Sequence, residues 1–249
     1  MRILSLATAL LLAGCAALAP VPETAGIDAV LIGEQHDAEA HGRIQERWVS
    51  TLAQRGQLGA VALEMAEQGT STAGLPRTAS DEQVREALQW NKGTGWPWER
   101  YGPAIMAAVR AGVPVVGGNL SRDQLRQAMK DTTLDVLLPG PALKAQQQAI
   151  RRGHCDMLPE TQVQPMTRVQ IARDISMARA ISSSAAPGKT VVLLAGSGHV
   201  LPDLGVPQHL PRTLVARSVL LPSQQTGRDY CEEFRKQQEH VQHRRQAAR

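Results

Sequence analysis

Two copies of a Gly-x-x-His motif lie far apart in this chain, and each follows an apolar run typical of a buried strand. The first copy is Gly33–His36 and the second is Gly196–His199. Apolar runs of this kind are typical of a parallel sheet covered on both faces, and ligands gather at the carboxyl ends of its strands. Glycine there allows the backbone to turn sharply. We therefore expect His36 and His199 to face one shared crevice.

Acidic residues accompany these histidines. Glu34 precedes His36 by two residues, so both side chains face the same side of an extended backbone. Glu64 ends the next predicted strand, which lies beside the first if consecutive strands are neighbours. Such residues suit zinc, manganese or iron with a position open for water, and a spare glutamate serves as general base. The candidate metal ligands are Glu34, His36, His41 and His199. The candidate catalytic residues of a hydrolase are Glu34, His36, Glu64 and His199. Alternatively, each histidine is only a hydrogen-bonded residue of the fold.

The elements that must position these residues alternate along the chain. We expect strands over residues 28–33, 60–65, 113–117, from 191 onward and over 213–221, and helices over 39–54, 80–90, 103–111, 121–130 and 162–184. This alternation predicts an α/β fold, a single domain with a central, largely parallel β-sheet flanked by helices. A composition of 43% apolar and 20% charged residues fits one ordinary globular domain.

Charge is distributed unevenly. The formal net charge is +4, and much of the basic excess lies in the C-terminal tail, residues 223–249. No basic stripe with interleaved aromatic residues occurs in the core segments, so nucleic acid is not an expected partner. We interpret the tail as a frayed helix or solvated arm, and attraction to anionic lipid head groups is an alternative role.

The N-terminus predicts export and attachment to a membrane. A basic start at Met1-Arg2, a short apolar run over residues 3–12 and a small-residue site define a secretory signal, and the run is too short to span a bilayer. Leu-Ala-Gly-Cys resembles the lipobox of bacterial lipoproteins, which predicts a signal peptide over 1–14 and acylation of Cys15. Residues 15–25 are then the lipidated cysteine and a tether, and residues 26–222 are the folded domain. Ala16 favours the bacterial outer membrane by analogy with lipoprotein sorting. A plain signal peptide with an incidental cysteine is the alternative.

The two remaining cysteines have two interpretations. Cys155 and Cys231 form an even pair in an exported protein, which suits a disulfide tying the tail to the domain. Alternatively, His154 and Cys155 form a soft ligand pair for a metal or haem.

Aromatic residues are scarce but clustered. Trp90, Trp96, Trp98 and Tyr101 fall within twelve residues, in a segment whose glycines and proline predict a loop leading into a helix. Such a loop either covers a flat apolar ligand as a lid or plugs the connection onto the sheet.

Several short motifs follow one another in a fixed order between residues 27 and 221. They are Gly33–His36 with His41, the strand end at Glu64, Trp96-Pro-Trp-x-x-Tyr101, Pro114–Arg122, Gly153–Cys155, Met166–Ala178 and Ala195–His199. In this order they resemble the ChaN family of iron-regulated, haem-binding bacterial lipoproteins. The resemblance implies a surface lipoprotein of haem uptake that holds haems between two protomers, with an outer-membrane haem receptor as a further partner.

The resemblance also implies a set of haem-binding residues. In that family a tyrosine ligates the iron and a histidine of the partner chain contacts the propionates. Tyr101 and Tyr230 are the two tyrosines that can supply a phenolate here, and His154, His199 or Cys155 are possible substitutes. Arginine suits the propionates because guanidinium matches carboxylate geometry. The candidate haem-binding residues are Tyr101, His154, Arg122 and Arg173.

The ChaN family is in turn similar to the Tiki metalloproteases and to the erythromycin esterases. Glu34, His36, Glu64 and His199 match the active-site motifs of those enzymes. This wider resemblance implies an alternative function, a metal-dependent hydrolase of peptidase or esterase type that uses the paired Gly-x-x-His pocket. A lipoprotein that only binds a partner, without chemistry, is the third possibility.

Overall fold

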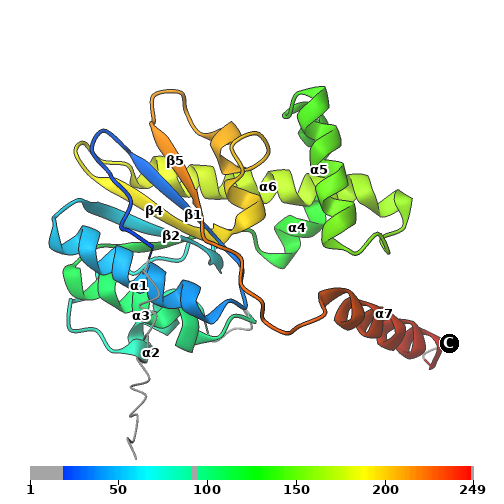
Figure 1. Cartoon of the computed structure of the whole chain (residues 1–249), viewed down its shortest axis with the longest axis horizontal. Coiled ribbons are helices and arrows are strands. Elements are labelled where there is room, and N and C mark those ends of the chain that lie inside the picture. The colour runs from blue at the N-terminus through cyan, green and yellow to red at the C-terminus, as the bar shows by residue number, and fades with distance from the viewer. Residues whose placement is uncertain (1–18, 91–94, 248–249) are drawn as a thin grey trace, which may run out of the picture.

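The computed structural model describes residues 19–90 and 95–247, with side chains up to residue 240. Its centre is a five-stranded sheet in the order β3-β2-β4-β1-β5, and all neighbouring strands run parallel (Figure 1). The strands are β1 (Ala29–Glu34), β2 (Leu58–Glu67), β3 (Val115–Asn119), β4 (Thr190–Gly196) and β5 (Ala216–Leu220). The prediction of an α/β domain with a central parallel sheet is confirmed.

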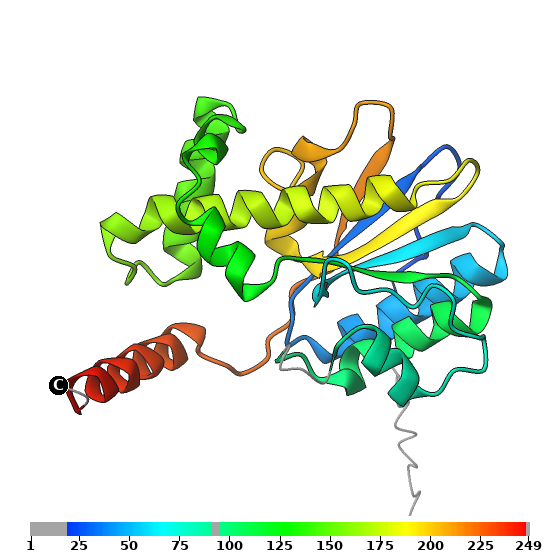
Figure 2. The same cartoon turned by 180° about the vertical axis from the view of Figure 1, so that it is seen from behind.

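Helices cover both faces of the sheet. One face carries α1 (Glu39–Gln54), α2 (Asp81–Ala87) and α3 (Trp98–Ala111), and the other carries α6 (Glu160–Ser184), which lies across the sheet in Figure 2. Side chains of β1 alternate between these layers, as the pleat of a strand requires. Ile32 packs in the core beneath α1 and α3, whereas Leu31 packs with Met177 and Ile181 of α6.

A helical lobe extends from one side of the sheet. It comprises α4 (Arg122–Ala128), the 3-10 helix η1 (Thr132–Val136), α5 (Gly140–Gly153) and the first half of α6. The lobe has its own small apolar core, which includes Leu134, Leu138 and Ile171. The sequence analysis did not predict α5, a helix rich in polar residues of which only Gln146 and Ile150 are buried.

The strand order differs from the simplest expectation. Strands β1 and β2 are consecutive in the chain, but β4 lies between them and pairs with both. The segments after β4 are two short 3-10 helices, η2 (Ser197–Val200) and η3 (Val206–His209). Helix α3 begins at Trp98, five residues before the predicted start, and Pro103 lies inside it. The buried side chains of Trp98 and Tyr101 pack this first part of the helix onto the core.

The two ends of the described chain contact the domain differently. Residues 19–25, expected to belong to a tether, lie against α1, where the Ala19 carbonyl accepts a hydrogen bond of 3.1 Å from Trp48 Nε1. The predicted signal peptide and the lipidation site at Cys15 lie outside the described residues. Helix α7 (Tyr230–Ala247) extends away from the body (Figure 1). Among the described residues, no helix is long and apolar enough to cross a membrane.

The disulfide interpretation of the cysteine pair holds in the structure. Cys155 and Cys231 are bonded to each other, across 76 residues of chain. The alternative, in which Cys155 and His154 form a free ligand pair, is not compatible with this bond.

Candidate functional site

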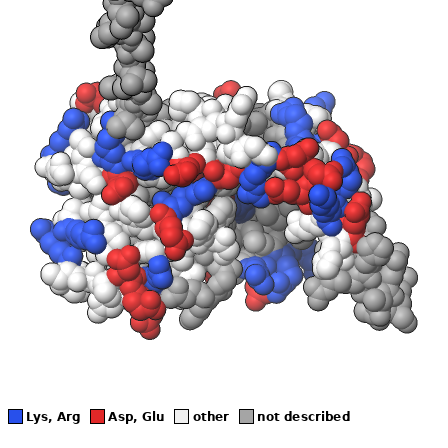
Figure 3. All heavy atoms as spheres, turned by 60° about the horizontal axis from the view of Figure 1, so that its bottom comes forward, with Lys and Arg blue, Asp and Glu red and all other residues white. Residues whose placement is uncertain are grey.

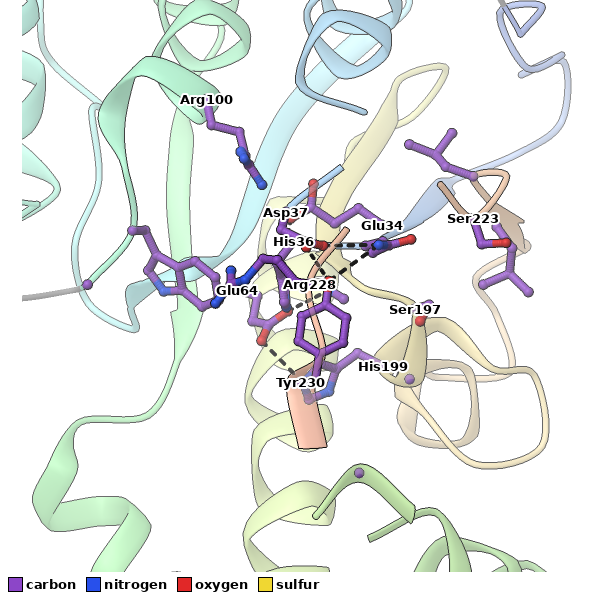
Figure 4. Close-up of a pocket in the computed structure, with 18 of the residues that line it drawn as sticks. Glu34, His36, Asp37, Glu64, Arg100, Ser197, His199, Ser223, Arg228 and Tyr230 are labelled. Atoms are coloured by element: carbon purple, nitrogen blue, oxygen red, sulfur yellow. Dashed lines mark hydrogen bonds and ion pairs between the residues drawn. The ribbon is translucent and has the colours of Figure 1, made fainter. Parts of the chain in front are cut away.

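A pocket of about 1050 Å³ opens at the carboxyl ends of β1 and β4. Its walls come from three further parts of the chain: the start of α3, the inner side of α6, and the connection from β5 to α7. Figure 4 shows these walls converging on Glu34, His36, Glu64 and His199. The pocket therefore lies where a parallel sheet presents its strand ends.

The two Gly-x-x-His motifs fit against each other at this edge. A Cβ atom on Gly196 would lie 2.7 Å from His36 Nε2, and a Cβ on Gly33 would lie 2.4 Å from Val200 Cγ2. Each motif thus needs glycine because the other motif occupies the space of a side chain. His36 and His199 both line the pocket as a result.

Glu34 connects His36 to the protein interior. Its Oε1 atom lies 2.7 Å from His36 Nδ1 and accepts a hydrogen bond of 2.6 Å from the Tyr101 hydroxyl. Burial alone would lower the pKa of His36, but Glu34 and Glu64 outweigh it and raise that pKa. Tyr101 is completely buried, and burial together with Glu34 raises its pKa far above the ordinary value. Tyr101 therefore remains a neutral donor below the pocket.

Glu64 joins the strand ends. Its Oε2 accepts a hydrogen bond of 2.6 Å from the Gly196 amide, and its other oxygen pairs with Arg173 and lies 3.4 Å from His199 Nε2. Burial raises the pKa of Glu64, but the charges of His199 and Arg173 lower it well below the ordinary value. This carboxylate contacts the amide of Gly196 because β4, not β1, is the neighbour of β2.

His199 lies between two carboxylates. Its Nδ1 is 2.5 Å from Asp174 Oδ1, and both side chains are buried. Burial alone would lower the pKa of His199, but Glu64 and Asp174 raise it to about 9. Burial raises the pKa of Asp174 to about 6, against the opposing charge of His199. At pH 7 the pair is therefore ionised. We refer to Glu34, Glu64, Tyr101, Asp174 and His199 as the floor cluster.

His41, a candidate metal ligand, has a structural role. Its Nδ1 accepts a hydrogen bond of 3.0 Å from the Gln35 amide, and its Nε2 donates to the Pro222 carbonyl at 2.9 Å. Both ring nitrogens are thus used by the backbone. Within residues 19–90 and 95–247, no group of three or more histidine, cysteine, aspartate or glutamate side chains is arranged to hold a metal ion. The expectation of a divalent metal at Glu34, His36, His41 and His199 is not supported.

The connection between β5 and α7 crosses the mouth of the pocket. We call residues 222–230 the strap; Ser223, Arg228 and Tyr230 of this segment line the pocket. The Tyr230 hydroxyl donates to Asp37 Oδ2. Burial raises the pKa of Asp37, but hydrogen bonds from Tyr230, Thr226 and Gln35 lower it to about 2. In Figure 4 the Tyr230 ring lies in front of the floor cluster.

The other candidates fall in different places. Arg173 lines the pocket, whereas Arg122 is exposed at the start of α4 and is not among the lining residues. His154 ends α5, and its Nδ1 lies 2.7 Å from the Ile150 carbonyl. Trp96 faces the pocket with its ring centre 4.6 Å from that of His36. The buried aromatic residues Trp90, Trp98 and Tyr101 pack below it. The aromatic segment 90–101 therefore supplies a wall of the pocket and also packs the connection onto the core.

Sequence reasoning did not single out several pocket residues. They are Asp37, Arg100, Gln170, Ser197, Ser223 and Arg228, together with Asp174, which is buried behind His199 and does not line the pocket. Asp37 follows the first motif directly, and Asp174 follows Arg173, so their proximity in sequence to candidate residues was an available signal. No such sequence signal existed for Arg228, because its position at the pocket depends on the path of the strap.

Charge on the outer surface is mixed. On the face seen in Figure 3, Lys and Arg side chains alternate with Asp and Glu side chains and form no extended patch of one sign. Three arginines, Arg100, Arg173 and Arg228, line the pocket itself.

Comparison with protein families shows to which family the chain belongs. A family model described as haem-binding uptake, Tiki superfamily, ChaN, matches residues 21–210. The chain belongs to the ChaN family. The match covers the whole sheet except β5 and leaves the strap and α7 outside it.

One solved structure of a ChaN protein shares the fold of this chain. The structure described as "Cofacial heme binding to ChaN of Campylobacter jejuni" has a TM-score of 0.65 and 22% identity, covering 80% of this chain and 83% of that one. The type III effector HopBA1 gives a TM-score of 0.41 and 17% identity, over 81% of this chain and 79% of that one. No curated protein matches the chain.

Proposed function

We propose that this ChaN-family chain binds haem in the pocket and acts as an outer-membrane lipoprotein in haem uptake. The observation that carries the proposal is the position of Tyr230. Its phenol lies at the pocket mouth, 46% exposed, and lines a cavity that also contains three arginines. A tyrosine phenolate is an established axial ligand of haem iron.

The other lining residues fit a haem. A volume of about 1050 Å³ is at the upper end of the range for cofactor sites. Trp96, Pro97, Leu220 and Leu221 supply apolar surface for a macrocycle. Arg100 and Arg228 have guanidinium groups suited to propionates. Haem, when bound, supplies the iron; the chain supplies the ligand, the cations and the apolar wall.

The two tyrosines differ in their fitness as an iron ligand. Tyr101 has no exposed surface, so an iron in the pocket cannot reach its hydroxyl, which donates to Glu34 in the interior, whereas Tyr230 is 46% exposed. The Tyr230 hydroxyl donates to Asp37, a carboxylate at the pocket rim that orients the phenol. We therefore assign ligation to Tyr230, and a structural role to Tyr101.

A dimer in the haem-loaded state and a lipid anchor at Cys15 belong to the same proposal. The Campylobacter ChaN structure is described as binding haem cofacially, and for this chain we propose that two protomers hold haems between their facing pockets. The exposed position of Tyr230 leaves room for such an arrangement. An outer-membrane receptor that supplies the haem is the expected further partner.

A haemin titration of the full chain tests this proposal. We expect a saturable Soret shift and a tyrosinate charge-transfer band. Tyr230→Phe is expected to lose the band and to weaken binding by at least about a hundredfold, since even loss of an outer-shell partner costs about 10–100-fold. The matched control, Tyr101→Phe, keeps the band. Sedimentation with and without haemin measures dimer formation. Absence of saturable binding contradicts the proposal, and a band lost only in Tyr101→Phe contradicts the ligand assignment.

One observation favours hydrolysis as a second candidate. His36 is fixed through Nδ1 by Glu34 while its side chain remains 35% exposed in the pocket. A histidine held in this way is suited to accept a proton from water. Assay of peptide and ester substrates with wild type and His36→Gln tests this candidate, and the bound-metal content of the same samples tests its metal dependence. Equal rates in both proteins would exclude it.

A further inference from the structure

The strap is fastened at both ends but lies mostly exposed between them. At its start, the His41 Nε2 atom donates to the Pro222 carbonyl, and the Leu221 amide donates to the Gly33 carbonyl at 2.9 Å. From residue 222 to 230 only Gln224 and Thr226 are half-buried. Apolar burial therefore contributes little to holding the strap over the pocket.

Polar contacts hold the middle of the strap. Gln35 and Gln224 exchange two hydrogen bonds: Gln35 Oε1 accepts from the Gln224 amide at 3.0 Å, and Gln35 Nε2 donates to the Gln224 carbonyl at 3.1 Å. Tyr230 adds its bond to Asp37. Exposed hydrogen bonds contribute only about 0.5–1.5 kcal/mol each, so these contacts alone allow the strap to open.

The far end of the strap is fastened covalently. Cys231 directly follows Tyr230, and its partner Cys155 lies two residues after Gly153, which lines the pocket from the helical lobe. The strap therefore crosses from the sheet edge to the lobe. Beyond the disulfide, the Phe234 ring lies 5.7 Å from the His154 ring. The disulfide holds Tyr230 and Arg228 at the pocket far more tightly than these exposed contacts do.

We propose that the Cys155–Cys231 disulfide is a redox latch on the strap, which sets how long the pocket retains its ligand; the ligand itself rests on the haem-binding function proposed above. A dithiol reductant opens the latch. One of its thiolates attacks a sulfur of the disulfide, which forms a mixed disulfide and releases the other cysteine as a thiolate. The second thiol of the reductant, as its thiolate, then attacks the reductant's own sulfur in the mixed disulfide and releases the first cysteine. The reductant leaves as a disulfide and the protein holds two thiols. Tyr230 is then tethered only through the nine residues of the strap.

The first test measures haemin loss from the full chain, using apomyoglobin to capture the released haemin. We expect loss to be about tenfold faster after reduction, because the disulfide raises the effective concentration of Tyr230 at the pocket. The double variant Cys155→Ser/Cys231→Ser controls for reduction of haem iron. It should lose haemin at the fast rate with or without reductant. Equal rates for the oxidised protein, the reduced protein and the double variant overturn the latch while leaving haem binding intact.

The second test needs no ligand. Trypsin cleavage after Arg228, followed by mass spectrometry, measures opening of the strap in the haem-free full chain. Cleavage should be about tenfold faster in the reduced protein and in the double variant, whereas cleavage after the exposed residue Arg110 of α3 should not change. If haemin fails to bind but the cleavage difference is found, the proposed function fails and the latch stands. Cleavage that is independent of the disulfide overturns the latch.

Discussion

The floor cluster and the strap are two parts of one pocket built in opposite ways. The floor cluster is buried and its charges pair with one another, as His199 does with Glu64 and Asp174. The strap is exposed, and its polar groups bond to the rim of the pocket through Gln35 and Asp37. Buried charges are tolerated only when paired, whereas exposed groups remain available to a ligand. We therefore infer that the floor cluster stabilises the fold and that the strap contacts the ligand.

The largest expected difference between the two regions concerns loss of a carboxylate. Glu64→Gln should reduce the free energy of unfolding by about 3–5 kcal/mol, because it removes the buried carboxylate that pairs with half-buried Arg173 and lies beside buried His199. The same change at the pocket rim, Asp37→Asn, should cost only about 0.5–1.5 kcal/mol, because the half-buried Asp37 only accepts hydrogen bonds from neutral donors there. Urea unfolding of both variants with the disulfide intact measures the difference. Equal costs would show that the floor is not an electrostatic unit.

The next effect is a pH dependence that belongs to the floor. The folded pKa of His199 is about 9, above its ordinary value of 6.5, so the stabilisation is complete below pH 6.5 and disappears as the pH rises through 9. The free energy of unfolding should fall by about 1.4 kcal/mol per pH unit within this window. The raised pKa of Asp174 changes the free energy of unfolding only between pH 3.8 and about 6, which is below this pH window. The raised pKa of His36 adds to the fall in the free energy of unfolding with pH.

Urea unfolding at pH 6.5, 7.5 and 8.5 measures this dependence. His199→Gln should remove most of the slope, whereas His36→Gln, which changes the more exposed histidine, should keep most of it. A slope of unchanged size in His199→Gln would contradict the assignment to the buried pair.

The smallest expected effect is the difference between the two tyrosines in how much each hydroxyl contributes to the free energy of unfolding. Tyr101→Phe removes the hydroxyl that donates to Glu34 in the interior and should cost about 1–3 kcal/mol. Tyr230→Phe changes an exposed residue and should stay within about 0.5 kcal/mol. Thermal or urea unfolding of the haem-free proteins measures both. A larger cost for Tyr230→Phe would mean that the strap supports the fold, and the contrast between the two regions would then be false.

The sequence predicted most of the fold because its strongest signals are local. Apolar runs that end at glycine marked β1 and β4. A helix was expected over 39–54, and α1 has these bounds, with Ile44, Trp48 and Leu52 buried at four-residue spacing. Helix α5 was missed because it is rich in polar residues and buries few side chains. The order of the strands was not predicted, since periodicity contains no information on which strands become neighbours.

The candidate site was predicted in part. Glu34, His36, Glu64, His199 and Arg173 line one pocket, as strand ends of a parallel sheet allow. His41 was placed among metal ligands because its residue type and spacing agree with that role, but the backbone occupies both ring nitrogens. Arg122 and His154 matched family motifs, yet neither lines the pocket. Residue type alone does not reveal which partner a side chain finds.

The sequence by itself determined the alternation of strands and helices, the two glycine–histidine motifs and the membership of the ChaN family, because each depends on residues close together in the chain. Only the tertiary structure decided that β4 separates β1 from β2, that Tyr101 is buried on Glu34, and that a disulfide brings Tyr230 across the pocket mouth. These are contacts between distant segments. They are set by packing and by the pairing of buried charges, which no local pattern of residues records.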